Sequence, residues 1–448
     1  MASSATLCVL SSATGHVTPE GVNQMRRLPA YARWAVAIVA LVVVALCAGA
    51  VRAAPPPANV YVDAAGLCKG KVPCYTTIQA GIDAAVPGNV VQIYRGTYHE
   101  HVLLATAITL RGDGNPVVTG DGSGDVITVT AVGATLTKLT VQNGAVGVRM
   151  LGDWVGAASG NMLLDLKISG CESGILFSGW AHGNTVQDTD VTGSSLFAIN
   201  VGDSGNSGNQ FLHLKLHKNP GKGLNAYSGS DGLVLRDSSI EKNGNGGVQI
   251  GWSGGWTIEH NEIVDNVGMG VLTDTVWSGA ITHNYIARNS QAGVGEAGYV
   301  STVTTRDNRI ESNAWSGVYF QIGSSNVVQH NMLVGNGRYG VEIPYHSYGN
   351  NYNSVTGNYI FKAAGSLGDA FDDAGLNTWD GNYYSGNLPW VAPFLIPGLA
   401  ATTDTTPLMQ SALPKPATKA DCRKDGWWLL TNGTAPFANE GKCVAFAR

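Results

Sequence analysis

The sequence predicts an all-β solenoid, a stack of coils built from short parallel strands, and three observations lead to this prediction. Four similar blocks begin at His260, His283, Asp307 and His330, which lie 23, 24 and 23 residues apart. A Gly-Val pair follows each block a few residues later. Glycine accounts for 59 of the 448 residues, whereas only 13% of the residues are charged. A period of this length, with one short apolar strand per side, is typical of units that bury their faces by stacking.

The first 53 residues are expected to be an export signal. An apolar run over residues 34–50 follows a group of arginines and ends in Val51-Arg52-Ala53, a pattern that signal peptidases cleave. Residues 1–24 would then be extra sequence ahead of a signal peptide that begins at Met25. A retained membrane anchor is the alternative, although about 17 apolar residues is the lower limit for a span. We expect a secreted, periplasmic or cell-surface protein without a stable membrane anchor after cleavage.

Charge and cysteine content bear on partners and compartment. The net charge of -5 and the lack of a basic stripe predict no nucleic-acid partner, and we expect a monomer. Five cysteines follow residue 53, which fits an oxidising compartment. Cys68 with Cys74, and Cys422 with Cys443, are the expected disulfides, because each pair would close a local loop. Cys171 is left over.

The coils align on a central aliphatic residue that is expected to face inward. The residue five positions earlier is also apolar in nine of ten coils, so a second column is expected inside. Only stacking of parallel coils about 4.8 Å apart buries both columns. The central residues are Val141, Ile168, Val191, Leu216, Ile240, Ile263, Ile286, Ile310, Leu333 and Ile360.

Two columns of asparagine accompany the central aliphatic residues. Stacked asparagines are expected to hydrogen-bond along the axis and to satisfy buried turn backbone. Cys171 occupies the first column in its own coil, which predicts a buried structural thiol. The first column contains Asn219, Asn243, Asn266, Asn289, Asn313 and Asn336, and the second contains Asn261, Asn284, Asn308, Asn331 and Asn358.

The segments on either side of the coils are expected to cover the ends of the stack. Within an N-terminal cap at 54–104, strand-like stretches at 60–62 and 90–94 flank a short helix, which Thr77 caps and Pro87-Gly88 ends. Such a cover avoids an exposed sheet edge. The remaining segments are the coils at 105–388, about eleven in number, a wrapping linker at 389–418 and a cysteine-bounded tail at 419–448.

Several motifs resemble those of a known superfamily. The repeats, and the stretch Tyr75–Ala85 with Gly96-Thr97-Tyr98, resemble right-handed parallel β-helix proteins, the superfamily of pectate lyases and polygalacturonases. Asp369–Asp373 and Trp379–Tyr384 resemble the closing coil of its NosD-like branch, which includes periplasmic proteins linked to copper-enzyme maturation. The likeness spans about residues 58–410. It implies a right-handed parallel β-helix and says little about activity.

The superfamily's usual site, the outer face of one strand column, would here be formed by the Gly-Val strands. With valine inward, the outward positions include Gln249, Tyr319, Gln321 and Glu342. Polar side chains flanked by exposed aromatics suit an extended sugar chain. The alternative is that the aromatics pack loops onto the coil flank. The aromatics in the adjoining turns are Trp180, Trp252, Trp256, Trp277, Tyr299, Tyr345 and Tyr348.

Catalysis would require a carboxylate pair. Asp274 and Glu342 lie three coils apart, or about 14 Å, beyond the roughly 5–9.5 Å of paired carboxylates in glycoside hydrolysis. Strand alternation places Glu296 inward, but its coil has one extra residue, so a bulge would turn it outward about 5 Å from Asp274. Asp274 and Glu296 would then be the acid/base pair of a lyase or hydrolase. An inward Glu296 would instead be a buried acid with a raised pKa.

Motifs of related enzymes are absent as sets. The polygalacturonase set Asn-Thr-Asp, Asp-Asp and Gly-His-Gly is incomplete, and the Asp-Pro-His motif of alginate epimerases does not occur. A calcium-dependent lyase would need several clustered carboxylates, which the outward columns do not offer.

A third constellation lies three residues before the central aliphatic. His260 and His283 would be about 4.8 Å apart and would share a transition metal such as copper. The favoured alternative is that short polar residues cap the turn backbone. The column contains Asp165, Asp188, His213, Asp237, His260, His283, Asp307 and His330.

These observations favour an exported β-helix protein that binds an extracellular polysaccharide along the Gly-Val face, with cleavage of the chain left open. Two alternatives remain: a non-catalytic cell-surface or adhesion rod, and a NosD-like periplasmic copper-maturation factor. The cofactor is open between calcium, copper and none.

Overall fold

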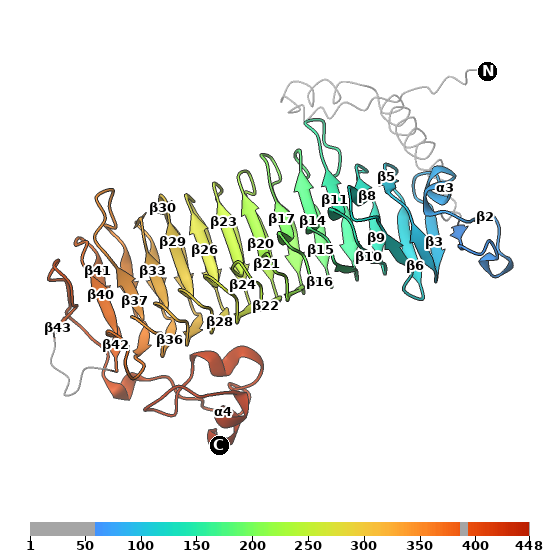
Figure 1. Cartoon of the computed structure of the whole chain (residues 1–448). Helices are drawn as coiled ribbons and strands as arrows, with labels where there is room; N and C mark the ends of the chain where they lie inside the picture. The colour runs from blue at the N-terminus through green and yellow to red at the C-terminus, as the bar shows by residue number, and fades with distance from the viewer. Residues whose placement is uncertain (1–58, 386–392, 448) are drawn as a thin grey trace, which may run out of the picture. The chain divides into compact units, whose positions relative to one another are not determined.

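The computed structural model describes residues 59–385 and 393–447, so the expected export signal lies outside the described residues. Three parallel sheets run along a stack of coils (Figure 1). Each coil adds one strand to sheet A, one to sheet B and one to sheet C, in that order along the chain. The predicted all-β parallel solenoid is therefore confirmed.

Sheet A has 17 strands within the described residues. Its predicted inward column is confirmed: all ten residues are buried, including Thr305, the one polar member. The strands are β1 (Asn59–Val62), β2 (Cys74–Tyr75), β3 (Val90–Tyr94), β6 (Thr109–Asp113), β9 (Thr135–Thr137), β12 (Met162–Leu164), β15 (Thr185–Gln187), β18 (Gln210–Leu212), β21 (Val234–Arg236), β24 (Trp256–Glu259), β27 (Gly279–Thr282), β31 (Val303–Arg306), β35 (Val327–Gln329), β38 (Ser354–Thr356), β41 (Thr378–Asp380), β43 (Phe394–Leu395) and β44 (Thr403–Asp404).

Sheet B has 13 strands in the described part of the chain, which gives about 13 coils where eleven were expected. The ten predicted central aliphatics are the buried middle residues of β10 to β39. The extra coils come from β4 and β7, which lack the asparagines of both columns, and from β42, where Asn382 continues the second column but the central residue is Tyr384 in place of an aliphatic one. The strands are β4 (Thr97–His99), β7 (Val117–Thr119), β10 (Thr140–Gln142), β13 (Lys167–Ser169), β16 (Asp190–Thr192), β19 (Lys215–His217), β22 (Ser239–Glu241), β25 (Glu262–Val264), β28 (Tyr285–Ala287), β32 (Arg309–Glu311), β36 (Met332–Val334), β39 (Tyr359–Phe361) and β42 (Tyr383–Tyr384).

Sheet C contains the Gly-Val strands, and the valines face inward as predicted. A separate short pair, β30 (Val300–Ser301) and β34 (Gly323–Ser324), lies in the loops that follow β29 and β33. The twelve described strands are β5 (Val102–Leu104), β8 (Asp125–Val129), β11 (Val146–Leu151), β14 (Ser173–Ser178), β17 (Phe197–Val201), β20 (Lys222–Tyr227), β23 (Val248–Gly251), β26 (Val271–Asp274), β29 (Val294–Ala297), β33 (Val318–Phe320), β37 (Val341–Ile343) and β40 (Ala370–Asp372).

The two predicted asparagine columns form continuous hydrogen-bonded ladders. In the first, Asn243 Nδ2 donates to Asn266 Oδ1 at 2.9 Å, and the pattern repeats in the next coils. In the second, Asn261 Nδ2 donates to Asn284 Oδ1 at 3.0 Å. The backbone N–H of each donor residue bonds to the same oxygen. Each asparagine therefore satisfies its own coil and the next one.

Buried aspartates end these ladders at the C-terminal side. Asn382, the last member of the second ladder, donates its backbone N–H and its amide to Asp404 Oδ2 at 2.9 and 3.1 Å. A further ladder, which the sequence alignment missed, ends where Asn377 donates to Asp372 Oδ1 at 3.1 Å. A carboxylate only accepts, so it completes a chain of donors without leaving an amide N–H unpaired.

The ends of the stack are covered much as expected. Helix α3 (Ile78–Asp83) packs its buried Ile78 and Ile82 on the first coil, and Thr77 caps it by accepting from Ala80 N at 3.3 Å. The first strands of all three sheets lie within the residues expected to form the cap. At the other end, β44 pairs with β41 and closes sheet A.

Both expected disulfides are present, Cys68–Cys74 beside the 3-10 helix η1 (Cys68–Gly70) and Cys422–Cys443 in the C-terminal segment. Cys171 is a buried free thiol with 3% exposure, as predicted, and burial raises its pKa.

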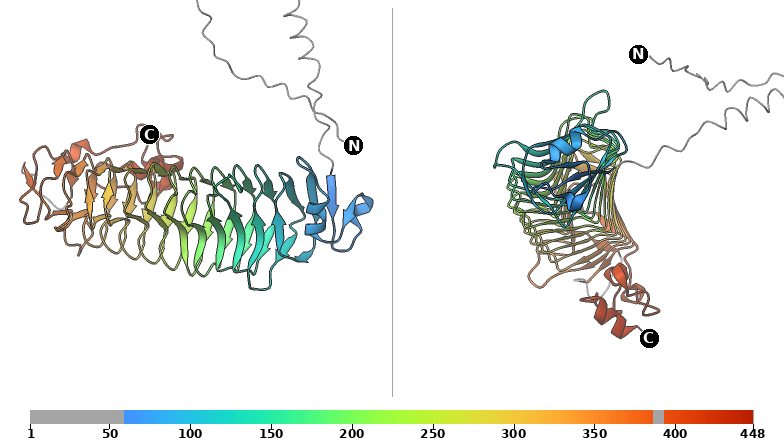
Figure 2. Two further views of the ribbon diagram at one scale, coloured as in Figure 1. Left: turned by 90° about the horizontal axis from the view of Figure 1, so that it is seen from above. Right: turned by 90° about the vertical axis from the view of Figure 1, so that its right-hand side faces the viewer.

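The C-terminal tail, which we define as residues 408–447, packs against the outer flank of sheet B (Figure 2). It contains the short helices η2 (Gln410–Ala412), η3 (Lys424–Leu429) and α4 (Glu440–Phe446). Leu413 lies in an apolar cluster with Met332, Phe361 and Tyr383 of the coils. In the described part of the chain, no helix is both long and apolar enough to cross a membrane.

Candidate functional site: an aromatic edge beside sheet C

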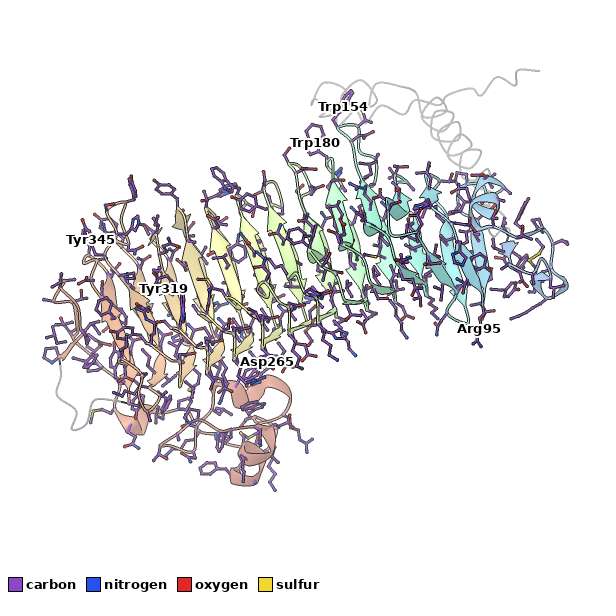
Figure 3. All side chains as sticks on the ribbon, viewed as in Figure 1. Arg95, Trp154, Trp180, Asp265, Tyr319 and Tyr345 are labelled. Atoms are coloured by element: carbon purple, nitrogen blue, oxygen red, sulfur yellow. A yellow bond between two sulfur atoms is a disulfide. The ribbon has the colours of Figure 1, made fainter. Side chains whose placement is uncertain are left out.

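A row of exposed aromatic side chains follows the loops that lead from sheet C to sheet A. We call this row the aromatic edge. Trp154, Trp180 and Tyr345 mark its course along one side of the stack (Figure 3). The exposed fractions run from 41% for Trp180 to 80% for Trp154, so none of these rings belongs to the core. Its members are Trp154, Trp180, Trp252, Trp277, Tyr299, Tyr345 and Tyr348.

Glycines of neighbouring coils support two of these indoles. The indole of Trp180 lies so close over Gly205, one coil further on, that a β-carbon there would overlap it. The indole of Trp277 lies in the same way over Gly254, one coil earlier. The rings therefore have a backbone floor beneath them and solvent above. Such preorganised apolar platforms lose little freedom when a ligand stacks on them.

Two tryptophans of the edge also occupy an unfavourable backbone region. Trp180 has φ +70° and Trp252 has φ +48°, values that bulky residues rarely adopt. The cost is not offset by burial, because both side chains are about half exposed. The residues at the place of Trp252 in the neighbouring coils, Ser228 and Thr275, are also left-handed, so the repeat itself imposes this conformation there. Sequence reasoning placed both residues in the turn but gave no sign of this conformation.

A hollow of about 460 Å³ lies between two of the aromatic loops. Trp154 and Trp180 line it, together with Asp153 and His182. Asp153 Oδ1 accepts backbone N–H bonds from Val155 and Ala157 at 3.0 and 2.9 Å, which fixes the loop. Two aromatic faces beside polar groups are the usual surroundings of a bound sugar ring. Trp154 was not among the predicted site residues, although its loop is as long as the loop that contains Tyr345 and Tyr348.

The outer face of sheet C adjoins this edge and contains the predicted polar positions. Gln249 and Tyr319 are partly exposed and Gln321 is exposed, as expected. Glu342 is on the same face but only 3% exposed, because Arg338 pairs with it at 2.5 Å and Ser316 donates a hydrogen bond to it. Glu342 is thus occupied by protein partners.

Trp256 corrects one expectation, because it is 1% exposed and cannot form part of an outer surface. It is the first residue of β24 and lies two positions before the inward Ile258, so strand alternation turns it inward. Its indole lies over Gly279 of the next coil. Strand alternation in the sequence could have shown that Trp256 is buried. The prediction was wrong because Trp256 was assigned to the turn that it follows.

The expected pairing of Asp274 with an outward Glu296 is also wrong. Sheet register aligns Thr273 with Glu296 and Asp274 with Ala297, so no bulge separates the coils there. Glu296 is 1% exposed and points inward, where Asn326 Nδ2 donates to its Oε2 at 2.8 Å. Asp274 is partly exposed on the other side of the strand, and its Oδ1 accepts from Thr275 Oγ1 at 3.0 Å. The two carboxyl groups therefore do not face one substrate.

Burial determines the protonation of Glu296. Removal from water raises its pKa well above the usual value, because no cation compensates the charge. The other oxygen, Oε1, has no hydrogen-bond partner. Glu296 is therefore a neutral carboxylic acid inside the coil stack, which was the alternative reading of the sequence.

The column of aspartates and histidines has a backbone explanation. All eight residues have φ between +50° and +56°. Asp, Asn and His are enriched in this left-handed region, and Asp and His recur at this turn between sheets A and B. The rings of His260 and His283 stack with centroids 5.0 Å apart. No group of three or more His, Cys, Asp or Glu side chains within the described residues is placed to hold a metal ion.

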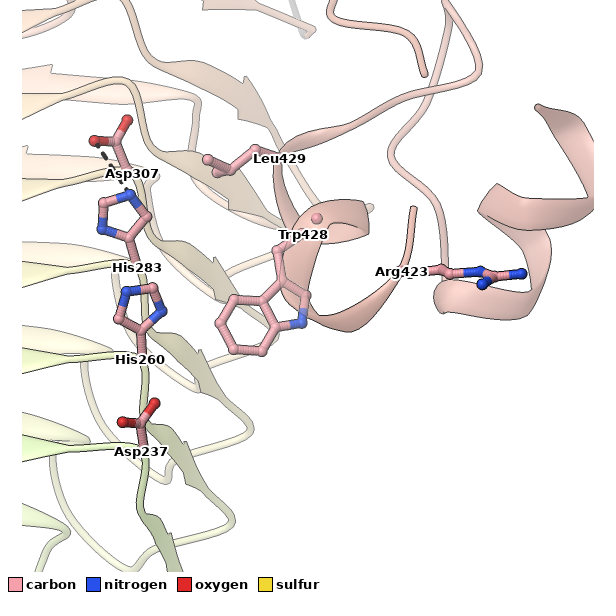
Figure 4. A pocket seen from close by; sticks show the side chains of 8 residues that line it. Asp237, His260, His283, Asp307, Arg423, Trp428 and Leu429 are labelled. Atoms are coloured by element: carbon pink, nitrogen blue, oxygen red, sulfur yellow. Dashed lines mark ion pairs between the residues drawn. The ribbon is translucent and has the colours of Figure 1, made fainter. Parts of the chain in front are cut away.

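The tail covers part of this column and leaves a pocket of about 480 Å³ (Figure 4). Trp428 of the tail faces His260 and His283 across this pocket. The ring of Trp428 also stacks on Tyr285 at 5.5 Å.

Arg309 fastens the tail next to this pocket. Its guanidinium lies 4.6 Å from the ring of Trp427, donates to the carbonyl of Trp428 at 3.4 Å and pairs with Glu311. Packing of the tail on the coils therefore explains the presence of Trp427 and Trp428 without a ligand.

Comparisons with known proteins agree with this architecture. The A-module of mannuronan C-5 epimerase AlgE6 from Azotobacter vinelandii is 18% identical over 68% of this chain and 93% of that one, with a TM-score of 0.60. The AlgE4 A-module of the same organism is 18% identical over 68% and 95%, with a TM-score of 0.58. At these identities the likeness shows the fold alone.

No curated protein sequence matches the chain. The family model described as the right handed beta helix region matches residues 105–263 and 228–387. This model is general, and the resemblance of the closing coil to NosD-like proteins remains a prediction. The chain belongs to the family of right-handed β-helix proteins.

Proposed function

We propose that this protein binds an extended extracellular polysaccharide along the aromatic edge and the adjoining face of sheet C. The observation that supports this most is the row of exposed aromatic rings, of which Trp180 and Trp277 lie on glycines of a neighbouring coil. Nothing in the packing of the coils requires these rings, since the core is complete without them. A ligand explains their presence better than stability does.

The spacing of the row favours a chain over a small ligand. Neighbouring coils lie about 4.8 Å apart, so successive loops offer contacts at short regular intervals along the axis. Sugar rings stack their apolar faces on aromatic side chains and direct hydroxyl groups sideways. Gln249 and Gln321 on the adjoining face supply amide donors and acceptors for such hydroxyls.

Binding without cleavage is the form of the proposal that the geometry supports best. Glu296, the carboxylate expected beside Asp274, is inside the stack, and Glu342 on the outer face lies three coils away and is paired with Arg338. Acid/base chemistry on a glycosidic bond uses two groups that reach the same bond. A non-catalytic surface rod remains the competing function, and it requires no ligand on this edge.

Affinity electrophoresis through gels that contain soluble polysaccharides tests the proposal. We expect a polysaccharide that retards the protein from residue 54 onward, and Trp180→Ala and Trp252→Ala should each abolish most of the retardation. Phe446→Ala is the control, because Phe446 is an exposed aromatic residue of the C-terminal tail, which packs on sheet B and not on the aromatic edge. Equal retardation of all variants, or none across a broad panel, would contradict the proposal and favour the rod. Ultraviolet absorbance and reducing ends, followed in the same samples, would reveal cleavage.

A further inference from the structure

We infer that the aromatic edge selects neutral polysaccharides and rejects acidic ones. This inference rests on the proposed function, because it specifies which class of chain the same edge accepts. It differs from what the printed names of the structural neighbours would suggest for them, since those proteins act on mannuronan.

The loops from sheet C to sheet A contain several aspartates, and their basic residues are the histidines His182 and His346. Asp153, Asp203, Asp231 and Asp274 lie in or at the start of these loops. The loops that contain Trp154, Trp180, Trp252, Trp277 and Tyr299 have neither lysine nor arginine. Between Trp154 and Trp277 the edge therefore has four carboxylates along its aromatic rings, whereas the loops that contain Tyr299, Tyr345 and Tyr348 have none.

The bonding of these aspartates leaves their charge uncompensated. Asp153 accepts from two backbone N–H groups, Asp231 Oδ1 accepts from Gly254 N at 2.6 Å, and Asp274 accepts from a hydroxyl. None of the four forms an ion pair with a basic side chain among the described residues. Neutral partners orient a carboxylate without removing its field. Within about 8–10 Å at physiological salt, that field repels a polyanion.

Basic residues on the adjoining face do not reverse this. Arg149 pairs with Asp125 at 2.6 Å, and Arg338 pairs with Glu342 at 2.5 Å. Lys222 is mostly buried and donates to the side-chain oxygen of Gln249. A uronate chain would therefore have to break an ion pair to reach either arginine. Lys222 is bonded to a neutral amide and keeps its charge, but this single, mostly buried cation does not outweigh the four aspartates of the loops.

Uncharged sugars gain from the same arrangement. Their hydroxyl groups donate to carboxylates, and such charge-assisted hydrogen bonds are stronger than neutral ones. In the hollow between Trp154 and Trp180, Asp153 offers an acceptor beside two apolar faces. A hexose ring fits this combination, because it has apolar faces and a rim of donors.

A matched pair of ligands provides the test: a soluble neutral glucan and its carboxymethylated derivative, each assayed by affinity electrophoresis with calcium and with chelator. Neutral mannan and xylan accompany them, with alginate and polygalacturonate as further acidic chains. We expect retardation by at least one neutral chain and none by the carboxymethylated glucan. Retardation by acidic chains in preference to neutral ones, lost in Trp180→Ala, would overturn the inference and leave the proposed function intact. No retardation by any chain would instead defeat the proposed function.

A charge variant makes the inference independent of the choice of sugar. In Asp153→Asn/Asp203→Asn/Asp231→Asn/Asp274→Asn, the amide oxygens still accept the backbone bonds of Asp153 and Asp231, so the loops are expected to fold. Affinity for acidic chains should rise about tenfold, because two exposed and two partly exposed negative charges are removed. Affinity for a neutral chain should not rise. An unchanged, negligible affinity for acidic chains in this variant would show that charge is not the selecting property and would overturn the inference.

Discussion

Asn284→Ala removes one rung from a buried ladder, and the structure allows its cost to be worked out. The Asn284 side chain accepts from Asn261 N and Nδ2 at 2.9 and 3.0 Å. It donates to the carbonyl of Ile258 at 2.9 Å and to Asn308 Oδ1 at 3.0 Å. Each bond contributes a net 0.5–1.5 kcal/mol, so the four together contribute about 2–6 kcal/mol. The site is fully buried, so water cannot replace the lost partners.

Urea unfolding, followed by tryptophan fluorescence and by circular dichroism, measures this cost. The control is Asn245→Ala, which removes an exposed asparagine two coils earlier and should change stability by less than about 0.5 kcal/mol. We expect a clearly lower midpoint for Asn284→Ala in both signals. Equal midpoints for the two variants would refute the argument that the ladders stabilise the stack.

Three further predictions follow from buried or packed groups. Glu296 keeps its proton in the folded state above pH 4.5, whereas the unfolded chain releases it, so wild-type stability should fall as pH rises from there. The Glu296→Gln variant has no carboxyl group at this position and should not lose stability in this way, so the difference between its urea midpoint and that of the wild type should increase from pH 4 to pH 8. A difference in midpoint that does not change with pH would contradict a buried neutral acid. Cys171 should resist a thiol reagent in the native protein and react in guanidinium, because it is buried with a raised pKa; fast native reaction would be inconsistent with its placement. Arg309→Ala should free the tail to protease, releasing a C-terminal fragment faster than the control Arg306→Ala, an exposed arginine on β31; equal rates would show that Arg309 does not fasten the tail.

The parts of the fold that repeat could be predicted from the sequence, because stacking imposes the same environment on each coil. The central aliphatic residues of successive coils have the same surroundings, and so do the asparagines of each ladder. Ten aligned residues therefore show what one position of the coil requires. Strand alternation also placed Glu296 inside the stack, and the structure confirms this. The bulge that would have turned Glu296 outward is not present. Trp256 was misplaced for the opposite reason, since nearness to a turn was given more weight than its spacing from Ile258.

The parts of the site that do not repeat could not be predicted. The hollow between Trp154 and Trp180 depends on a ten-residue loop that most coils lack, and its conformation is not contained in the period. The tail also folds outside the repeat. The sequence did contain one indication that the tail covers sheet B. The outward residues of its later strands are apolar, as at Met332, Tyr359 and Phe361, whereas earlier coils have lysine, serine or aspartate there. An apolar outer face needs a cover, and the tail provides it.

The most direct test of the central claim is to locate the bound polysaccharide on the protein. Hydrogen–deuterium exchange, compared with and without an oligosaccharide of a chain that retards the protein, reports where the backbone becomes protected. The account predicts slower exchange in the loops 179–184, 252–255 and 275–278, with no change in the tail. Protection confined to the pocket beside His260 and Trp428, or to the B-to-C turns on the opposite edge, would contradict it.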